Sequence, residues 1–556
     1  MTTWPIVGDG KSIRPSHIIT LQDAIDGVQD GTVPIALAGI ADALGAYEAG
    51  KARVYADVSA IADDNIPAIN AALLAVSAEG GGEVLLPTHK QFPIRPSVTN
   101  YIQIPDNCRL NLGDARLQVA SDSPAYTYLI SATGGPTSAV SNVSIVGGEI
   151  DQNPAGHILS NAAVNGQYCV LLYNAQHVLF DGVNVITCGS NAVAVNGSTC
   201  ADVRVNGNTF TFTKDNATAY DNSAVYLHAL GIEASGNQFY SQLSEQARGC
   251  IEIHGPLSVA HGNRSQNYWT LFNLVSSNTT LDAMVDRYLV DISGNVGYGL
   301  RAGITIWPRT GSTYRGVSIN DNQLYIVQKT GNWKDASGVA FVAGNTFDGD
   351  VEGLHITNNQ ITFETGDTRT VDSDGTTLSH ANTHAIHTGA HSKLSDAQIK
   401  NNTIVNAPLN GIYLGNTLYS GAEHENVLVE GNLQVNTGSN RSLHRDTRCP
   451  FVLAGKFTNT RIRNNPVIVA NADGTSGDPR YVYMYGGATS GGGNVFEGND
   501  IIVNGGYTLV ETDISSIFSL RRSAAATTLG TVVKKQQVFD RYGVSLGYVP
   551  IYDAIT

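Results

Sequence analysis

Glu252 and His254 have the residue types and the spacing that acid–base chemistry needs. They stand two apart in the run Ile251-Glu252-Ile253-His254, and residues two apart on a β-strand point to the same side of the sheet. Enzymes that hydrolyse glycosidic bonds hold two carboxyl groups about 5 to 5.5 Å apart when they retain configuration and about 6.5 to 9.5 Å apart when they invert it. Glu252 would be one such carboxyl group, with His254 as a proton donor or acceptor beside it.

The second carboxyl group has several candidates. Glu245 stands just before the predicted strand, Asp282 and Asp286 stand in a long insertion after it, and Asp221 precedes the strand one repeat earlier. A neighbouring subunit would be a further source of this carboxyl group. The alternative interpretation is that Glu252 is a solvated carboxylate on an exposed strand with no catalytic role.

Aromatic residues in the middle third of the chain are suited to binding sugars, because a flat apolar ring with a polar edge matches the C–H face of a sugar. The candidates are Tyr226, Tyr268, Trp269, Trp307 and Trp333, with His228 beside Tyr226. Arg309 follows Trp307 by two residues and would pair with the carboxylate of an acidic sugar. The alternative is that these rings pack between subunits or beneath loops.

Four histidines are spaced so that a helix would bring them to one metal-binding face. They are His380, His384, His387 and His391. The repeat described below instead requires a strand over residues 385–387, which would split the set, so we predict no metal site and no cofactor. The run Asp372-x-Asp374-Gly375 lacks the distal glutamate of a calcium loop and predicts a turn.

The elements that must position these residues are indicated by a phrase repeated between Val143 and Ile501. It reads apolar, any residue, apolar, two residues, Asn, any residue, apolar, as in Val203-x-Val205-x-x-Asn208-x-Phe210. Ten of the twelve aligned central positions are Asn, at spacings of 25 to 43 residues. These positions are Gly148, Val183, Asn208, Asn237, Asn263, Asn295, Asn322, Asn359, Asn402, Asn432, Asn465 and Asn499.

The residue before each central position is Gly, Asp or Asn, the types that adopt positive φ most easily. Each repeat is therefore predicted to turn a sharp corner between two short strands. An Asn amide buried at that corner would donate to one neighbouring Asn and accept from the other, at about 1 kcal/mol net per link. Each inward Ile, Val or Leu would contribute roughly 1.5 to 3 kcal/mol, so the aliphatic interior would dominate stability and the Asn column would fix the register.

A further strand is predicted in each repeat from alternating apolar residues, for example over residues 225–228, 251–254 and 304–307. If the aliphatic residues face inward, the residues between them form a column on the outer face. Tyr226, Glu252 and Thr305 would belong to this column, within a few coils of one another. Because coils stack about 4.8 Å apart, the column has the reach of a short oligosaccharide.

This strand-rich period predicts an all-β chain folded as a parallel β-helix, in which each coil packs only on its neighbours. Before the repeats, Asn65 and Pro67 are typical of a helix start, and Ile66, Ile69, Leu73 and Val76 form its apolar stripe up to Gly80. We expect this helix to cap the open end of the solenoid. Residues 1–52 predict short helices in a small neck.

Composition excludes several classes of partner. The chain has 33 basic and 48 acidic residues, a net charge of −15, which argues against nucleic acid and against an anionic membrane surface. No basic leader and no long apolar run is present in the sequence. The six cysteines are scattered without a CxxC pair and are typical of packed, reduced thiols.

The segment before the repeats also carries a resemblance. Asp64-Asn65-x-x-Ala68-Ile69-x-Ala71-Ala72, Gly80-Gly81-Gly82-x-Val84-x-x-Pro87 and Ile104-Pro105-x-Asn107 resemble the opening segment of the pectate-lyase superfamily, and most of all that of the tailspikes of tailed bacteriophages. The run Gln537-Val538-Phe539-Asp540-x-x-Gly543-x-x-Leu546-Gly547-Tyr548 is similar to the short β-rich end of many such spikes. The resemblance covers about residues 54–556.

The resemblance implies a right-handed, single-stranded parallel β-helix that assembles as a homotrimer in the virion tail and binds, and usually cleaves, a bacterial surface polysaccharide. It carries over no catalytic residue. The expected organisation is a neck that attaches to a phage tail or baseplate protein (1–52), the opening and capping helix (53–140), the β-helix with a glycan-binding face (141–505) and a trimerisation segment (506–556). Three activities stay open: hydrolysis of a capsule or O-antigen, β-elimination at a uronate by His254 or Tyr226, and adhesion without cleavage.

Overall fold

The computed structural model describes most of residues 52–552 and two short segments before them. The described ranges are 7–8, 11–12, 52–60, 62–124, 126–135, 138–153, 168–187, 191–213, 223–242, 247–275, 289–309, 311–327, 336–341, 349–365, 383–389, 393–415, 422–438, 449–469, 482–484, 488–499, 501–503, 506–508, 519–520, 532–539 and 545–552. The helices predicted before residue 52 therefore lie outside the described residues. Among those described, no helix is both long and apolar enough to cross a lipid bilayer.

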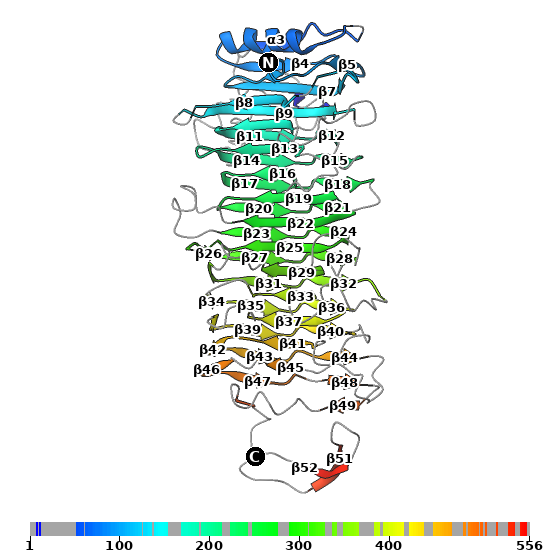
Figure 1. Cartoon of the computed structure of the whole chain (residues 1–556), viewed down its shortest axis with the longest axis vertical. Helices are drawn as coiled ribbons and strands as arrows, with labels where there is room; N and C mark the ends of the chain where they lie inside the picture. Colours follow the sequence, from blue (N-terminus) through cyan, green and yellow to red (C-terminus); the bar gives the residue numbers. More distant parts are fainter. Residues whose placement is uncertain are drawn as a thin grey trace, which may run out of the picture.

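The chain winds into a tall stack of coils, with α3 (Ile66–Ala78) and β4 (Gly82–Leu85) at one end and β51 (Val532–Phe539) and β52 (Ser545–Tyr552) at the other (Figure 1). Within each coil, one strand joins a thirteen-stranded sheet and two more, on either side of the predicted corner, join two further stacks, which we call the first and second ladders. All pairings between successive coils are parallel. The predicted fold class, a parallel β-helix, is confirmed.

The thirteen-stranded sheet contains the strands that alternation predicts over residues 225–228, 251–254 and 304–307. Its strands are β6 (Ile102–Gln103), β8 (Tyr128–Thr133), β10 (Tyr168–Tyr173), β13 (Val193–Asn196), β16 (Ser223–Leu227), β19 (Ala247–Ile253), β22 (Tyr268–Val275), β25 (Ala302–Trp307), β29 (Ala336–Phe341), β33 (Thr383–His387), β37 (Asn410–Leu414), β41 (Phe451–Leu453) and β45 (Val482–Met484).

The first ladder lies before the corner and the second after it, and two long strands, β7 (Cys108–Val119) and β9 (Val140–Asp151), belong to both. The first ladder comprises β3 (Ala52–Tyr55), β4 (Gly82–Leu85), β11 (Ala175–Asp181), β14 (Ala201–Asn206), β17 (Leu230–Ser235), β20 (Ser258–His261), β23 (Val290–Ser293), β27 (Val317–Asn320), β31 (His355–Thr357), β35 (Gln398–Lys400), β39 (Leu428–Glu430), β43 (Arg461–Arg463), β47 (Val495–Glu497) and β50 (Ser519–Leu520). The second comprises β5 (Gln91–Ile94), β12 (Asn184–Thr187), β15 (Thr209–Phe212), β18 (Gln238–Ser241), β21 (Arg264–Gln266), β24 (Val296–Leu300), β28 (Gln323–Ile326), β32 (Gln360–Phe363), β36 (Thr403–Val405), β40 (Leu433–Val435), β44 (Val467–Val469) and β48 (Ile501–Val503).

Smaller elements complete the described chain. A six-stranded sheet runs beside the later coils, through β26 (Thr313–Arg315), β30 (Asp350–Glu352), β34 (Lys393–Ser395), β38 (Glu423–Glu425), β42 (Lys456–Thr458) and β46 (Thr489–Gly492). Antiparallel partners are β1 (Val7–Gly8) with β2 (Lys11–Ser12), β48 with β49 (Gly506–Thr508), and β51 (Val532–Phe539) with β52 (Ser545–Tyr552). The last pair falls in the predicted trimerisation segment.

Backbone geometry and side-chain bonding confirm the predicted corners. All twelve residues that precede a central position have positive φ. From Asn237 to Asn499, each Asn accepts from the side-chain amide of the Asn of the preceding coil at 2.8 to 3.0 Å. Each also accepts the preceding Asn's backbone N–H. At the first central position no side chain fits, because a Cβ on Gly148 would lie 2.5 Å from Cβ of Leu112.

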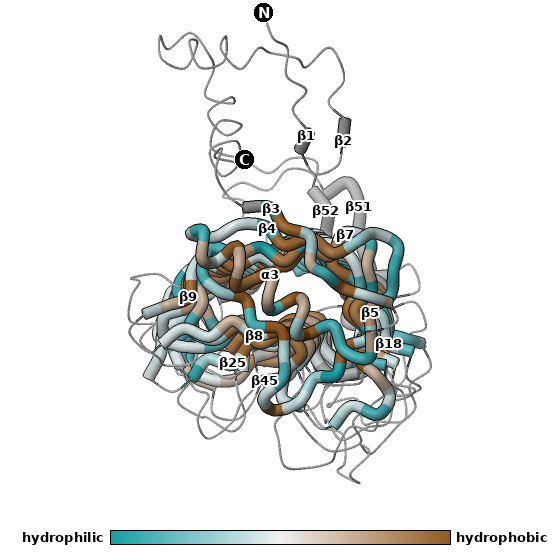
Figure 2. The backbone as a smooth tube through the Cα atoms, turned by 90° about the horizontal axis from the view of Figure 1, so that it is seen from above, coloured by the Kyte–Doolittle hydropathy of each residue, from teal (hydrophilic) through white to brown (hydrophobic). Residues whose placement is uncertain are grey.

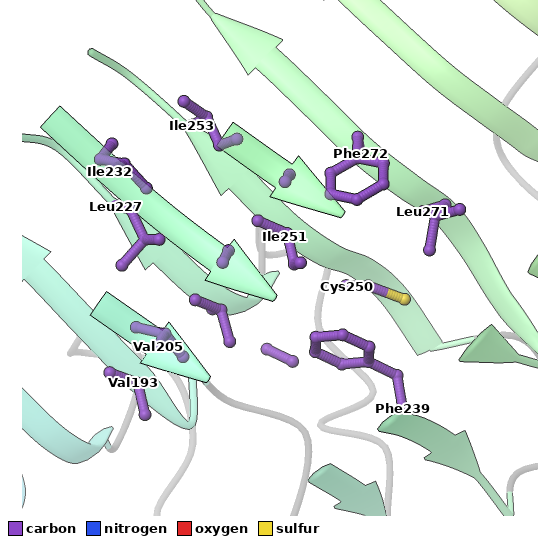
Figure 3. Close-up of a cluster of buried hydrophobic side chains, with 14 of the residues drawn as sticks. Val193, Val205, Leu227, Ile232, Phe239, Cys250, Ile251, Ile253, Leu271 and Phe272 are labelled. Carbon is purple, nitrogen blue, oxygen red and sulfur yellow. The ribbon is translucent and has the colours of Figure 1, made fainter. Parts of the chain in front are cut away.

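The interior of the solenoid is aliphatic and aromatic. Viewed along the axis, the tube encloses this interior (Figure 2). In the close-up of Figure 3, Ile251 and Phe272 of the thirteen-stranded sheet lie near Val205 and Phe239 of the two ladders, and all four are fully buried. Phe180, Phe210 and Phe239 stack on successive coils. The five described cysteines, Cys108, Cys169, Cys200, Cys250 and Cys449, are buried and form no disulfide.

Helix α3 (Ile66–Ala78) lies across the first coils (Figure 1), and the apolar stripe Ile66, Ile69, Leu73 and Val76 is buried. Asn65 precedes the helix as predicted, but its side chain does not cap the first turn. It instead bonds Ser59 and the carbonyl of Pro93. Asp64 accepts the N–H of Ile66 at 3.1 Å, because the Asn65 amide is already engaged in tying the helix to the first coil.

Candidate functional site

The outer face of the thirteen-stranded sheet carries the residues predicted to do chemistry. Strand pairing places Tyr226 beside Glu252 and Glu252 beside Asn273 on three successive strands, followed by Thr305 on the fourth. The aliphatic residues on either side of each column member point into the core. Pairing therefore confirms the predicted column.

Glu252 is the centre of a closed polar cluster. Its Oε1 lies 2.5 Å from Nε2 of His254, and the Ser223 hydroxyl donates to its Oε2 at 2.8 Å. Ser223 is fixed in turn because its backbone N–H donates to Oδ1 of Asn191 at 2.9 Å. Glu252 is only 6% exposed, so the expectation of an exposed, solvated strand carboxylate is wrong. Burial of this carboxylate is tolerated because both of its oxygens have partners.

A glycine makes room for this cluster. Gly249 lies beside Ser223 on the neighbouring strand, and a Cβ at Gly249 would lie 2.6 Å from the Ser223 hydroxyl oxygen and 3.1 Å from Nδ2 of Asn273. A side chain at this position would push Ser223 away from Glu252. Among the thirteen strands as the structure describes them, Glu252 is also the one acidic residue, so the cluster is the sole carboxylate site on this described surface.

His254 joins Glu252 to two further rings. The ring of Tyr226 lies 4.8 Å from that of His254, and the ring of His228, one coil earlier, lies 5.9 Å away. Burial, together with the nearby His254, lowers the pKa of His228 to about 4, so His228 is neutral at pH 7. Nδ1 of His228 lies 3.1 Å from Oδ1 of Asn196.

Two coils further along, Thr305 and Trp307 extend the polar surface. The indole N–H of Trp307 donates to the Thr305 hydroxyl at 3.2 Å, and Thr305 is hydrogen-bonded to Oδ1 of Asn273. Because Asn273 pairs with Glu252, a continuous series of polar side chains runs from Tyr226 to Trp307. This series lies along the axis of the solenoid, the direction that an extended glycan would follow.

The other predicted residues do not all join this series. Tyr268 is wrong as a sugar-binding candidate, because it is fully buried and packs edge-on against Phe212 and Phe239. Trp269 lies 5.8 Å beneath the guanidinium of Arg301, a cation that sequence reasoning missed. Arg309 is exposed after β25. Glu245, Asp282, Asp286, Asp221 and Trp333 lie outside the described residues.

The histidine set is divided between described and undescribed positions. His384 and His387 lie on the predicted strand, β33, with ring centres 4.4 Å apart, and Tyr413 packs against both. His380, His391 and the run 372–375 fall outside the described residues. The described part of the chain holds no group of three His, Cys, Asp or Glu side chains placed to bind a metal ion.

The Glu252 cluster is equipped for proton transfer. A carboxylate bound to Nε2 fixes the tautomer and orientation of an imidazole. The ring of Tyr226 provides a second polar group beside His254. Sequence reasoning missed Ser223, because the register of β16 and β19 places Ser223 opposite Gly249 and not opposite Glu252.

No protein-family model matches the chain, and no curated protein matches its sequence. Solved structures do match it. The tailspike of Escherichia coli bacteriophage HK620 in complex with a pentasaccharide is 14% identical, with a TM-score of 0.55 over 84% of this chain and 82% of that one. A mutant of the same tailspike in complex with a hexasaccharide is 13% identical, with a TM-score of 0.53 over 83% and 81%. This likeness shows a shared fold.

Proposed function

We propose that this chain, which shares its fold with a bacteriophage tailspike, binds a bacterial surface polysaccharide along the outer face of its thirteen-stranded sheet and cleaves it by hydrolysis near Glu252. The fold supports the choice of ligand, because the HK620 tailspike carries an oligosaccharide in its solved complexes. The observation that carries the site is Glu252, the one acidic residue on the thirteen described strands, held by Ser223 and His254.

In this proposal Glu252 and His254 act as one acid–base unit. Glycoside hydrolysis needs a group that protonates the leaving oxygen and a second that activates water or attacks the sugar. Glu252 bound to His254 supplies one of these groups. Glu245 and Asp282 are the proposed sources of the second carboxyl group, because they flank β19 and β22 in the sequence. Tyr226, His228, Trp269, Trp307 and Arg309 are the proposed sugar contacts.

Release of reducing ends tests the proposal. Purified protein is incubated with a panel of capsular and O-antigen polysaccharides, beside Glu252→Gln and a control, Glu79→Gln. Glu79 is an exposed residue at the end of α3, so its replacement leaves the outer face intact. We expect cleavage of at least one polysaccharide by the wild type and the control and loss of cleavage in Glu252→Gln. Equal cleavage by all three would remove Glu252 from the site.

A second candidate reaction is β-elimination, which the contact between Tyr226 and His254 favours. A lyase needs a base to take the proton next to a uronate carboxyl group and a cation to neutralise that group, the role of Arg309 in this alternative. Elimination leaves an unsaturated sugar that absorbs ultraviolet light, whereas hydrolysis does not. A glycan that is retained without any fragment being released would instead identify an adhesin.

The proposal extends to assembly. We propose that residues 506–556, which include the β51–β52 pair, hold three copies of the chain together. We further propose that residues 1–52 attach this trimer to a phage tail or baseplate protein, so that the protein acts from the virion tail. Sedimentation of the full chain beside a version ending at residue 505 tests the first part. A trimer that becomes a monomer on truncation is expected, whereas an unchanged mass would contradict it.

A further inference from the structure

The second ladder presents tyrosines to solvent on a face separate from the thirteen-stranded sheet. Tyr240 of β18, Gln266 of β21 and Tyr298 of β24 follow one another in register, and Tyr325 of β28 stacks on Tyr298. The two rings are 4.7 Å apart and inclined by 10°. Tyr240 is 39% exposed and Tyr298 56% exposed. We call these four residues the tyrosine platform.

Regular strand register places Tyr298 beside Tyr325. Val296 pairs with Gln323 and Gly297 with Leu324, so the residues that follow, Tyr298 and Tyr325, lie on the same side of the two strands. The pairing shifts after this point, because Leu300 pairs with Ile326. Gly299 supplies the extra residue with a φ of 70°, a conformation that suits glycine.

The polar residues around the platform are mainly uncharged amides. Gln238 and Gln323 are exposed beside the tyrosines, and the Tyr240 hydroxyl donates to Gln238 at 2.5 Å. Among the residues that the structure describes, Arg264 lies next to Gln238 in the register, and Glu364 follows β32. The first ladder differs, because its half-buried outward residues form ion pairs such as Arg463 with Glu430 and Lys400 with Glu430.

From these observations we infer that the tyrosine platform is a second glycan-binding surface, which takes a neutral segment of a polysaccharide. Aromatic rings pack on the C–H faces of sugars, and amide side chains bond their hydroxyl groups. A neutral glycan fits because the described residues around the tyrosines are mainly amides and the chain carries a net charge of −15, which would repel an acidic polymer. The inference goes beyond the proposed cleavage at Glu252 and does not depend on it.

The size of the exposed surface favours a glycan over a second copy of the chain. The exposed fractions of Tyr240 and Tyr298 together amount to roughly one whole tyrosine, about 200 Å². A stable protein interface buries about 800 Å² on each partner. The platform spans four successive coils, about 14 Å at the spacing of β-strands, which is the reach of a short oligosaccharide lying along the axis.

Affinity electrophoresis through gels that contain polysaccharide tests the inference. The full chain carries Glu252→Gln, so that no polymer is cut and binding is measured independently of cleavage. The probes are dextran, mannan and a set of neutral O-antigens, with alginate and polygalacturonate as acidic probes. The variants are Tyr298→Ala, Tyr240→Ala and Tyr298→Phe. The control is Tyr55→Ala, because Tyr55 is a tyrosine that is 67% exposed at the opposite end of the stack from β51 and β52.

We expect at least one neutral probe to retard the parent protein. Tyr298→Ala and Tyr240→Ala should each weaken the binding by about 10-fold, while Tyr298→Phe and Tyr55→Ala should stay within about twofold of the parent. Retardation by the acidic probes alone, no retardation by any neutral probe, or unchanged binding in both alanine variants would overturn the inference. A fall in mass on sedimentation of Tyr298→Ala would also overturn it and identify an interface between copies.

Discussion

Two stacks of polar side chains run along this solenoid, and they differ in kind. The corner column repeats one residue, Asn, through ten coils, and each amide is bonded to the next. The outer column of the thirteen-stranded sheet changes at every coil, from Tyr226 to Glu252, Asn273 and Thr305. The asparagines of the corner column are buried, and so are Glu252 and Thr305 of the outer column.

The difference separates structure from function. A residue repeated at every coil satisfies the same backbone groups each time, so its role is to hold the register. A column whose members vary cannot serve a repeated structural need. Its polar side chains can be buried because a local cluster, such as Ser223 with Glu252 and His254, provides their hydrogen-bond partners. Variation in a buried polar column therefore indicates the functional site. Substitutions in the outer column should lower activity, whereas substitutions in the corner column should lower stability.

The largest expected effect is on activity at Glu252. Removing a general acid or base lowers the rate by about 100- to 10,000-fold, so Glu252→Gln should lose at least 100-fold in polysaccharide cleavage. Its unfolding temperature should change little, because an amide retains the size of the side chain and a bond to Ser223. Initial rates and thermal unfolding, measured on one preparation, check both halves. A large loss of stability with cleavage retained would show that Glu252 stabilises the fold and takes no part in cleavage.

In the corner column, we expect a substitution to lower stability and to leave activity nearly unchanged. Asn322→Ala removes the bonds to Asn359 and to the carbonyl of Ile292, and takes one acceptor from the backbone N–H and the side-chain amide of Asn295. With roughly 1 to 3 kcal/mol for each buried group left unsatisfied, the free energy of unfolding should fall by about 3 to 5 kcal/mol.

The activity of Asn322→Ala per folded molecule should stay near the wild-type value. Asn320→Ala is the matched control, because Asn320 is a half-buried residue two positions away and should cost less than about 1 kcal/mol. Denaturant unfolding of the three proteins provides the comparison. Equal stability of both variants would show that the column does not hold the register.

Acid should weaken the fold through buried histidines. Burial lowers the pKa of His228, His387 and His424 to about 4, against about 6.5 in an unfolded chain. The folded state favours the neutral rings, so their stabilising effect is complete above about pH 6.5 and is lost as the pH falls towards 4. The apparent unfolding temperature should therefore drop steadily over that range at constant ionic strength.

One variant sharpens this prediction. His424 stacks on Phe457 with ring centres 4.6 Å apart, so His424→Phe retains an aromatic contact while removing a titrating group. The drop in unfolding temperature between pH 6.5 and 4.5 should be smaller in this variant. Parallel curves for the variant and the wild type would exclude His424 as a source of the acid sensitivity.

The smallest effect is expected at Ser223. Ser223→Ala frees Oε2 of Glu252 from a hydrogen bond worth roughly 1.5 to 3 kcal/mol to a charged group, but leaves the contact with His254. Cleavage should fall by about 10-fold, and Ser223→Thr should restore part of the loss by returning the hydroxyl. If Ser223→Ala cleaves as fast as the wild type, the Ser223 contact has no influence on the reaction.

Much of the fold could be predicted because repetition carries physical information. Residues that tolerate positive φ recur before each central position, and every one of them adopts it. Alternation likewise placed Glu252 and His254 on one face. The side-chain bonding of Asn65 could not be predicted in the same way, because its amide is hydrogen-bonded to Ser59 and Pro93. These contacts depend on how the helix packs on the first coil.

The site was harder to predict than the fold. Ser223 and Glu252 are 29 residues apart, and alternation along one strand does not reveal a partner on the next. Alternation also does not show whether an outward side chain is covered, so the burial of Glu252 was missed. The tyrosine platform could not be predicted either, because Tyr240, Tyr298 and Tyr325 lie on different coils and are brought together only by the strand pairing.

A crystal structure of Glu252→Gln with an oligosaccharide from a polysaccharide that the wild type cleaves would test the central claim most directly. The account predicts sugar rings along the outer face of the thirteen-stranded sheet, with a glycosidic oxygen within hydrogen-bond distance of residue 252 or of His254. A glycan that lies only on other faces of the solenoid, with the Ser223, residue 252 and His254 cluster unchanged and uncontacted, would contradict it.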